Sequence, residues 1–289
     1  MKQPSLLNTV PALRNQVRQW RAAGESVALV PTMGALHAGH VSLIELARSR
    51  AKRVIVSIFV NPTQFAPNED FSKYPRTFEA DVAKVAEAGA DAVFHPSADE
   101  VYPAGFSTTI SLTGPAVAGL EDKFRPTHFQ GVATIVAKLL LQSLPDVAIF
   151  GEKDFQQLAV IRQMVEDLEI PVEIVGAPTL RELDGLAMSS RNVYLDERQR
   201  TFANALHQSM QWAAGRIRDG ESIAVALRDS SASISAAGFL IDYLEVRDAK
   251  TLAPLGDGRK DGLRMLAAAR MGKTRLIDNI EVFAPESKG

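Results

Sequence analysis

The feature that most limits how this chain can fold is a regular alternation of two patterns up to about residue 175. Short apolar runs that stop at Gly or Pro occupy residues 27–30, 54–60, 92–94, 147–150 and 172–175. Segments with helical spacing lie between them, at residues 40–50, 77–88, 131–143 and 155–168. Short apolar runs bounded in this way are typical of buried strands. Their alternation with helices predicts an α/β fold, with a Rossmann-like parallel sheet covered by helices on both faces.

The pattern changes after residue 178. Residues 196–219 and 222–237 have helical spacing, and residues 238–246, 265–271 and 277–282 resemble strands. Helices followed by clustered strands favour a small α+β unit. We therefore predict two domains, a Rossmann-like domain at residues 1–180 and a smaller α+β C-terminal lid domain at residues 181–289. The Gly- and Pro-containing segment 97–129 predicts loops, with a short strand pair within residues 107–112.

Composition excludes several classes of protein. The 289 residues include no cysteine, which rules out disulfides, thiolate catalysis and zinc sites with Cys ligands. The net charge is −2, with no basic excess of the kind that long nucleic acids require. No apolar stretch approaches the ~18 residues of a membrane span, and residues 1–19 lack the apolar core of a signal peptide. We expect a cytoplasmic protein with no membrane or nucleic-acid partner.

Two histidines follow the first predicted strand. His37 and His40 are three residues apart, at the start of a helix, and Gly34 and Gly39 in the same turn permit close approach of a ligand. A helix N-terminus favours phosphate, and imidazoles there can donate hydrogen bonds to it. These histidines could instead be ordinary capping or core residues. Two of the chain's five histidines share this turn, which favours a functional interpretation.

Polar side chains also follow the second and fourth strands. Asn61 and Gln64 carry neutral amides that can hold the hydroxyls and carboxylate of a small acid, although turn formation explains them equally well. Lys153, beside a glycine at a strand end, can place a positive charge on phosphate oxygens. Asp154 is a plausible helix N-cap, and Gln157 faces the same way one turn later. Because ligands of open parallel sheets bind where the strands end, these residues predict one site.

Two further segments contain residue types found in phosphate sites. Ser189, Ser190 and Arg191 lie where the two predicted domains join, and they could wrap a triphosphate or simply form a linker. The sequence Gly272-Lys273-Thr274 resembles the end of a P-loop. A P-loop requires a glycine where this chain has Ala267, and the surrounding residues resemble strands, so we dismiss it.

Taken together, these motifs resemble those of the pantothenate synthetase (pantoate–β-alanine ligase) family. The resemblance rests on residues 31–40, 61–65, 151–158 and 188–195, supported by residues 74–77 and 125–129. It runs from about residue 25 to 195 and continues weakly to residue 280. Histidines spaced like His37 and His40 mark the wider nucleotidyltransferase superfamily. The four motifs in this order and spacing are much more specific.

The resemblance implies an ATP-dependent condensation of (R)-pantoate with β-alanine, which forms pantothenate, a precursor of coenzyme A. Pantoate would first react with ATP to give pantoyl adenylate and pyrophosphate, and the amine of β-alanine would then displace AMP. ATP would be a substrate, accompanied by Mg²⁺. Members of the family are typically dimers, so the resemblance also implies a homodimer.

Site residues are implied motif by motif. His40 would be catalytic, with His37 and Lys153 beside it on the phosphates. Gln64, Gln157 and Asn61 would bind pantoate, with Gln64 also near β-alanine. Asp81 alone stands where some members have two adjacent acidic residues near Mg²⁺, since its neighbour is Ala80. The implied ATP site comprises Met33, Gly34, Ala35, Leu36, His37, Ala38, Gly39, His40, Gly151, Glu152, Lys153, Asp154, Leu180, Met188, Ser189, Ser190 and Arg191.

Two other functions remain open at this point. A nucleotidyltransferase could act on another acid or on a phosphorylated acceptor, although the amides Asn61, Gln64 and Gln157 favour an uncharged hydroxy-acid pocket. A nucleotide-binding module without catalysis would bind ATP but release no pyrophosphate.

Overall fold

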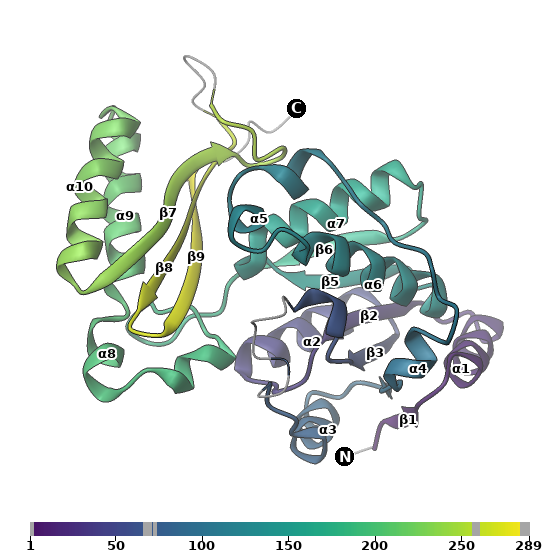
Figure 1. The fold of residues 1–289 in the computed structure, drawn as a ribbon. Helices are drawn as coiled ribbons and strands as arrows, with labels where there is room; N and C mark the ends of the chain where they lie inside the picture. The colour runs from purple at the N-terminus through teal and green to yellow at the C-terminus, as the bar shows by residue number, and fades with distance from the viewer. Residues whose placement is uncertain (1–2, 66–70, 72–73, 256–260, 284–289) are drawn as a thin grey trace.

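The computed structural model describes residues 3–65, 71, 74–255 and 261–283. Its larger half is built on a six-stranded sheet in which every neighbouring pair is parallel (Figure 1). The strands, in their order across the sheet, are β1 (Ser5–Leu7), β4 (Ala92–Phe94), β3 (Arg53–Ile58), β2 (Val27–Thr32), β5 (Val147–Gly151) and β6 (Glu173–Ala177). The predicted parallel α/β sheet is confirmed, and β1 is a strand that the sequence pattern did not reveal.

Helices cover both faces of this sheet. Successive strand residues point to opposite faces, so Leu29 and Ile55 pack into one apolar cluster while Val30 and Val56 pack into another. The first face carries α1 (Val10–Ala22), α6 (His128–Ser143) and α7 (Phe155–Asp167). The second carries α2 (Ala38–Arg50) and α3 (Phe78–Glu87). The strands read as continuous apolar runs because both of their faces are buried.

The order of the strands places a switch point between β2 and β5. From β2 the chain runs outward through β3 and β4, and it then returns to add β5 on the other side of β2. Ala28 of β2 lies beside Val147 of β5. The loops that leave these two strands diverge, and a crevice opens between them at the carboxyl edge of the sheet.

One local prediction was wrong. Residues 107–112 form no strand pair and have no regular secondary structure. The backbone N–H of Ile110 donates to the hydroxyl of Thr134 on α6 instead of to another strand, and Ile110 and Leu112 pack against the core. Short helical turns occupy much of the remaining connections in the larger half. They are η1 (Pro62–Gln64), α4 (Ala98–Val101), η2 (Gly114–Val117), α5 (Glu121–Phe124) and η3 (Glu152–Asp154).

The smaller half contains an antiparallel sheet of β7 (Phe239–Asp248), β8 (Leu263–Met271) and β9 (Thr274–Phe283). The helices α9 (Ala205–Arg218) and α10 (Ile223–Ala236) pack on one face, and η4 (Ser190–Tyr194) and α8 (Glu197–Phe202) precede them. The single helix predicted at residues 196–219 is therefore two helices, with Asn204 at the N-cap of the second. Gly272 and Lys273 form the turn between β8 and β9, which confirms that they belong to no P-loop.

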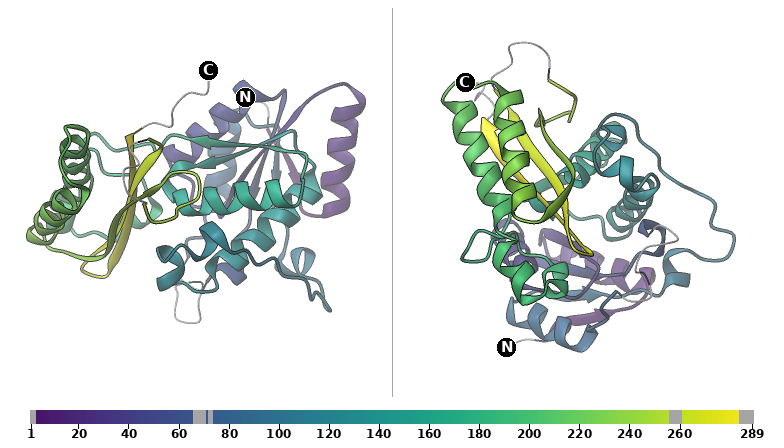
Figure 2. Two further views of the ribbon diagram at one scale, coloured as in Figure 1. Left: turned by 90° about the horizontal axis from the view of Figure 1, so that it is seen from above. Right: turned by 60° about the vertical axis from the view of Figure 1, so that its left-hand side comes forward.

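The antiparallel sheet lies between its own helices and the parallel-sheet half (Figures 1 and 2). Met265 and Ala267 of β8 pack toward α9 and α10, whereas Leu266 and Ala268 pack with Phe155 at the start of α7. Alternate residues of one strand thus serve two cores. The division into domains at residues 180 and 181 stays a prediction, since this second set of contacts crosses it.

Candidate active site

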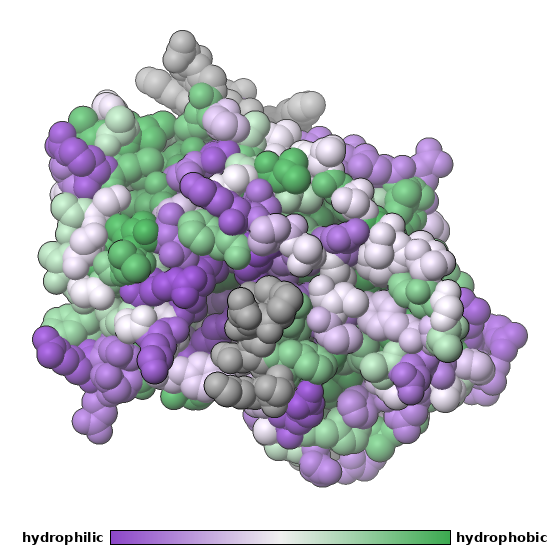
Figure 3. Space-filling view, in the orientation of Figure 1, coloured by the Kyte–Doolittle hydropathy of each residue, from purple (hydrophilic) through white to green (hydrophobic). Residues whose placement is uncertain are grey.

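A cavity of about 250 Å³ lies at the carboxyl ends of β2 and β5, at the switch point of the sheet. It adjoins a larger cavity of about 840 Å³ that reaches the C-terminal sheet. Lys153, Gln157 and Arg191 line both cavities. Hydrophilic residues gather between the two halves on the face that Figure 3 shows. The two cavities together form one cleft of a size that suits a nucleotide and a second small molecule.

The loop after β2 is shaped by Asp81 of α3. Its carboxylate accepts the backbone N–H groups of Ala35 at 2.9 Å and Leu36 at 2.8 Å, and the hydroxyl of Thr77 at 3.1 Å. Gly34 has a positive φ of 81°, and a Cβ there would lie 3.1 Å from the Asp81 carboxylate. The buried carboxylate therefore holds the turn that leads into α2.

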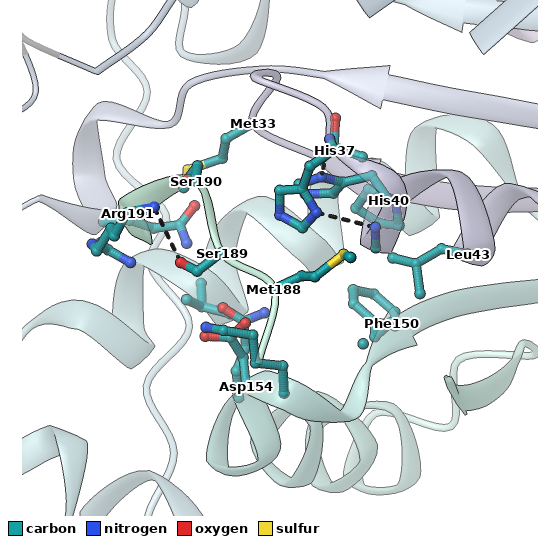
Figure 4. Close-up of a pocket in the computed structure, with 18 of the residues that line it drawn as sticks. Met33, His37, His40, Leu43, Phe150, Asp154, Met188, Ser189, Ser190 and Arg191 are labelled. Carbon is teal, nitrogen blue, oxygen red and sulfur yellow. Dashed lines mark hydrogen bonds between the residues drawn. The ribbon is translucent and has the colours of Figure 1, made fainter. Parts of the chain in front are cut away.

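His37 and His40 form the N-terminal cap of α2 and face the cavity (Figure 4). The backbone N–H of His37 donates to Nδ1 of His40 at 3.2 Å, and that of Gly39 donates to Nδ1 of His37 at 3.1 Å. Each Nδ1 thus accepts a hydrogen bond, so the proton of each neutral ring is on Nε2. The ring centroids are 4.1 Å apart. Capping and ligand binding are therefore compatible, because capping leaves both Nε2–H donors unused.

Both rings are neutral at physiological pH. Burial, and then the neighbouring His37, lower the pKa of His40 to about 3. Burial also lowers the pKa of His37, and the positive charges of Lys153 and Lys84 act in the same direction. A neutral imidazole with its proton on Nε2 can donate a hydrogen bond to a phosphoryl oxygen.

Asn61 lies behind the cavity wall and hydrogen-bonds to Gln64. Gln64 and Gln157 line the smaller cavity, but Asn61 is 1% exposed and is not part of its wall. The Asn61 amide donates to the side-chain oxygen of Gln64 at 2.9 Å and to the backbone carbonyl of Gly131 at 3.2 Å. Its own oxygen accepts the hydroxyl of Tyr102 at 2.8 Å. Asn61 therefore orients Gln64.

The turn after β5 brings Lys153 and Asp154 to the cleft. Asp154 stands at the N-cap position of α7, but its side chain makes no capping bond and is exposed to the cleft. Although the side chain opens to the cleft, the protein around it removes part of the hydration of the Asp154 carboxyl, which raises its pKa. The positive charges of Lys153 and Arg191 outweigh this effect and hold the pKa below its usual value. The carboxylate is therefore ionised and balances these cations.

The segment before α8 forms the opposite wall. Ser189 caps η4 by accepting the backbone N–H of Arg191 at 3.2 Å, and Met188 is tied through its N–H to the carbonyl of Leu180 at 3.0 Å. Figure 4 shows Ser189, Ser190 and Arg191 across the cavity from the two histidines. Segments that are more than 140 residues apart thus share one site.

Of the site residues proposed from the sequence, most lie in the wall of the smaller cavity and some do not. The wall includes Met33, His37, Gly39, His40, Gln64, Gly151, Lys153, Asp154, Gln157, Leu180, Met188, Ser189, Ser190 and Arg191. It does not include Gly34, Ala35, Leu36, Ala38, Asn61, Asp81 or Glu152. Gly34, Ala35 and Leu36 form the turn that Asp81 holds, so they shape the site from behind.

Several lining residues had no proposed role, among them three from the segments 74–77 and 125–129. Tyr74, Arg125 and His128 belong to segments that carried the resemblance, and each faces the cavity. Nη1 of Arg125 lies 3.2 Å from Nε2 of His128, and Nδ1 of His128 lies 3.1 Å from the Gln64 carbonyl. Since the guanidinium can only donate, His128 accepts at Nε2 and donates from Nδ1. Burial and then Arg125 lower the pKa of His128 to about 4. The contact of His128 with Gln64 joins residues 64 positions apart, and sequence spacing offers no signal for it.

Asp81, the residue that the resemblance placed near magnesium, is not arranged to hold that ion. Both carboxylate oxygens of Asp81 accept hydrogen bonds from the loop, and Asp81 is 1% exposed. Among the described residues no group of three or more His, Asp or Glu side chains could hold a metal ion. Asp81 is therefore a structural support in this geometry, and its assignment to a metal stays a prediction.

The sequence and the fold match known proteins along nearly the whole chain. Residues 5–281 match the family model described as pantoate-beta-alanine ligase. This chain belongs to the pantoate-beta-alanine ligase family. Pantothenate synthetase 2 of Bradyrhizobium diazoefficiens is 58% identical over 282 residues, which cover 97% of this chain and 99% of that protein. Pantothenate synthetase of Rhodopseudomonas palustris is 55% identical, with 96% and 99% covered.

Solved structures of the pantoate-beta-alanine ligase family have the same fold. Pantothenate synthetase from Thermus thermophilus superposes with a TM-score of 0.90 at 47% identity, covering 96% of this chain and 99% of that one. Pantoate-beta-alanine ligase from Francisella tularensis, complexed with beta-gamma ATP and beta-alanine, gives a TM-score of 0.80 at 34% identity, covering 96% and 98%. The chain is therefore an enzyme of this ligase family. The names of its relatives denote formation of pantothenate. Among the described residues no helix has the length and apolarity to cross a membrane.

Proposed function

We propose that this enzyme condenses (R)-pantoate with β-alanine through a pantoyl-adenylate intermediate and releases pyrophosphate and AMP. A carboxylate does not react with an amine until its oxygen becomes part of a good leaving group. In the first step a pantoate carboxylate oxygen bonds to the α-phosphorus of ATP, and the bond to pyrophosphate breaks. In the second step the β-alanine nitrogen bonds to the acyl carbon, the bond to AMP breaks, and the nitrogen loses a proton.

The observation that carries this proposal is that His37, His40 and Lys153 line the same cavity. Two Nε2–H donors and an ammonium group face a single space, where negative charge on phosphate oxygens would build up. Preorganised donors of this kind stabilise a transition state without reorganising during the reaction. We assign His40 the central catalytic role, with His37 and Lys153 beside it on the phosphates.

The acid would bind at the amide side of the cavity. Gln64 and Gln157 present neutral amides, which can donate to a carboxylate and accept from the hydroxyls of pantoate. Gln64 would also lie near β-alanine. The Francisella ligase, solved with beta-gamma ATP and beta-alanine, supports a site for both molecules in this fold.

ATP would occupy the cleft between Met33–His40, Gly151–Asp154 and the segment Met188–Arg191, with Leu180 against the nucleotide. Ser189, Ser190 and Arg191 would close on the triphosphate. Magnesium, when bound with ATP, neutralises phosphate charge. Since Asp81 is engaged by the loop, we propose that the ion enters with the nucleotide and that protein carboxylates contribute little to holding it.

Three further features belong to the same proposal. Residues 1–180 would act as the ATP- and pantoate-binding domain, and residues 181–289 as a lid domain. The enzyme would work in the cytoplasm as a homodimer, without nucleic-acid or membrane partners. Light scattering of the purified enzyme would test the dimer.

ATP–pyrophosphate isotope exchange tests the first step. We expect exchange with pantoate present and no amine, and none when pantoate is omitted. Exchange that depends on pantoate would leave only the transfer to β-alanine to establish, by release of AMP. A folded enzyme that binds ATP but shows no exchange with pantoate would overturn the proposal and require a panel of other acids.

A further inference from the structure

Asn279, on the last strand of the C-terminal sheet, contacts the turn that carries Lys153. Its side-chain nitrogen donates to the carbonyl oxygens of Glu152 and Lys153, each at 2.9 Å. Asn279 is 3% exposed, so water does not compete for these bonds. The turn η3 has no side-chain cap of its own, and neither has the start of α7. Its backbone is supported by a residue 126 positions away in the chain.

Arg264 of β8 fixes the orientation of this amide. Nε of Arg264 donates to the side-chain oxygen of Asn279 at 2.8 Å, so the amide nitrogen must face the two carbonyls. Nη2 of the same guanidinium donates to the Glu152 carboxylate at 3.0 Å. The guanidinium also lies 4.1 Å from the centroid of the Phe155 ring. Arg264 and Asn279 thus hold the chain on both sides of Lys153 and leave its ammonium group to the cleft.

The two residues can do this because of their places in the sheet. Leu276 and Ile280 of β9 pack into the core with α9 and α10, whereas Ile277 packs with the core shared with the parallel-sheet half. Asn279 alternates with Ile280 and so faces the parallel-sheet half. The C-terminal sheet therefore contacts η3 from the wall of the larger cavity, while Asn279 is not part of the wall of the smaller one.

We propose that Asn279, together with Arg264, is a positioning residue that aims Lys153 at the phosphates of the nucleotide. This inference rests on the proposed role of Lys153 in the adenylation step. A shift of about 1 Å in a catalytic group can reduce a rate ~10²-fold. A turn without caps would not hold a flexible lysine to that accuracy, and the two carbonyl contacts restrict the backbone from which the side chain projects.

The alternative is that Asn279 only joins the two halves of the molecule. Both interpretations predict some loss of stability when it is replaced, so stability does not separate them. They differ in whether the effect on rate depends on Lys153. A positioning residue acts through the group that it positions, and its removal costs little once that group is absent.

Asn279→Asp is the variant that best separates the two interpretations. The carboxylate keeps the size of the amide and the bond from Arg264, but it places oxygen against the carbonyls of Glu152 and Lys153. Pantoate-dependent ATP–pyrophosphate exchange is measured for the wild-type enzyme, for Asn279→Asp, for Lys153→Ala and for the double variant. Ser209→Ala is the control, because it removes a buried hydrogen bond of the C-terminal half, to Ser233 at 3.1 Å, and lies in the wall of neither cavity. Arg264→Lys provides a milder second variant. It retains the positive charge but loses the guanidinium that bonds to Asn279 and Glu152 at once.

We expect Asn279→Asp to lower the exchange rate ~10- to 100-fold in the wild-type background and less than about 3-fold when Lys153 is alanine. Ser209→Ala should stay within about 3-fold of the wild-type rate. Equal losses in both backgrounds, or a wild-type rate in a folded Asn279→Asp enzyme, would overturn the inference. If Asn279→Asp does not fold, the same comparison is made with Arg264→Lys.

The test separates this inference from the proposed function. If the wild-type enzyme shows no pantoate-dependent exchange, the proposed reaction fails. The same four proteins are then compared by equilibrium binding of ATP. A loss of ATP affinity in Asn279→Asp that vanishes without Lys153 still supports positioning, and equal losses in both backgrounds exclude it.

Discussion

The backbone N–H of His37 donates to Nδ1 of His40, and this one bond decides which hydrogen-bonding group His40 presents to the cavity. With Nδ1 occupied, the ring keeps its proton on Nε2 and can serve as a donor. The same contact caps α2. A helix cap and a site for negative charge are thus built from the same two side chains.

The low pKa of His40 makes the stability of the enzyme depend on pH. In the unfolded chain the pKa is about 6.5, whereas in the folded enzyme it is about 3. Between these values the unfolded state binds more protons, so stability falls as pH falls below about 6.5. We expect the unfolding free energy of the wild type to fall more than that of His40→Gln when the pH is lowered from 7 to 5. Urea titrations at several pH values measure it, and a constant difference between the two proteins would show that His40 titrates normally.

Lys153→Ala should lower pantoate-dependent exchange by at least ~10², because one preorganised donor is removed from the developing phosphate charge. His40→Ala should do the same. Lys52→Ala is the control, since Lys52 is exposed and lies outside both cavities, and its rate should match the wild type. Near-normal exchange in both Lys153→Ala and His40→Ala would refute the assigned roles.

Gly131→Ala should displace Gln64. Gly131 lies in α6 against η1, and a Cβ there would stand 2.3 Å from the backbone carbonyl oxygen of Thr63, next to Gln64. Backbone cannot move aside as a flexible side chain can, so we expect a higher KM for pantoate and a lower Tm. Steady-state kinetics and thermal unfolding measure both.

Gly215→Ala is the matched control for that change. Gly215 also lies within a helix, α9, but a Cβ there meets no atom within 4 Å. Alanine should stabilise this helix by about 0.4–1 kcal/mol without changing KM. An unchanged KM for pantoate in Gly131→Ala would show that η1 adjusts without moving Gln64.

Asp81→Asn separates a structural from a metal-binding role of this carboxylate. The amide can accept at only one end, so one of the bonds from Ala35, Leu36 and Thr77 is lost and the turn before α2 loosens. We expect a slower exchange rate and a lower Tm, with an unchanged Mg²⁺ concentration for half-maximal rate. A marked rise in that concentration would mean that Asp81 holds the ion.

Much of the parallel sheet was predictable because local pattern and burial agree in it. Runs such as 147–150 are apolar on both faces and end at glycine, and the structure has a strand at Val147–Gly151. The N-terminal strand Ser5–Leu7 and helix Val10–Ala22 were missed, although Thr9 caps that helix and a proline lies in its first turn. With three residues, β1 is too short for periodicity to detect, and only its pairing with β4 defines it.

Residues of the site were predictable where chemistry and position in the chain coincide, and not where contacts are distant in sequence. His37, His40, Lys153 and Gln157 follow strand ends, and they do line the cavity. Arg125 lies in a long irregular segment, and its place beside the cavity depends on how that segment folds back. The motif at residues 125–129 supported the resemblance, but nothing in its spacing placed Arg125 at the cavity.

The sequence by itself determined most of the strands and helices, the strand-end positions of the polar residues and the family, because these depend on local periodicity and short motifs. Only the tertiary structure decided which nitrogen of His40 carries its proton, that Asp81 serves the backbone of the loop, and that Asn279 supports the turn of Lys153. These are contacts between atoms brought together by folding. Hydrogen bonds act over about 3 Å, and the distance between two residues in space is not encoded in their separation along the chain.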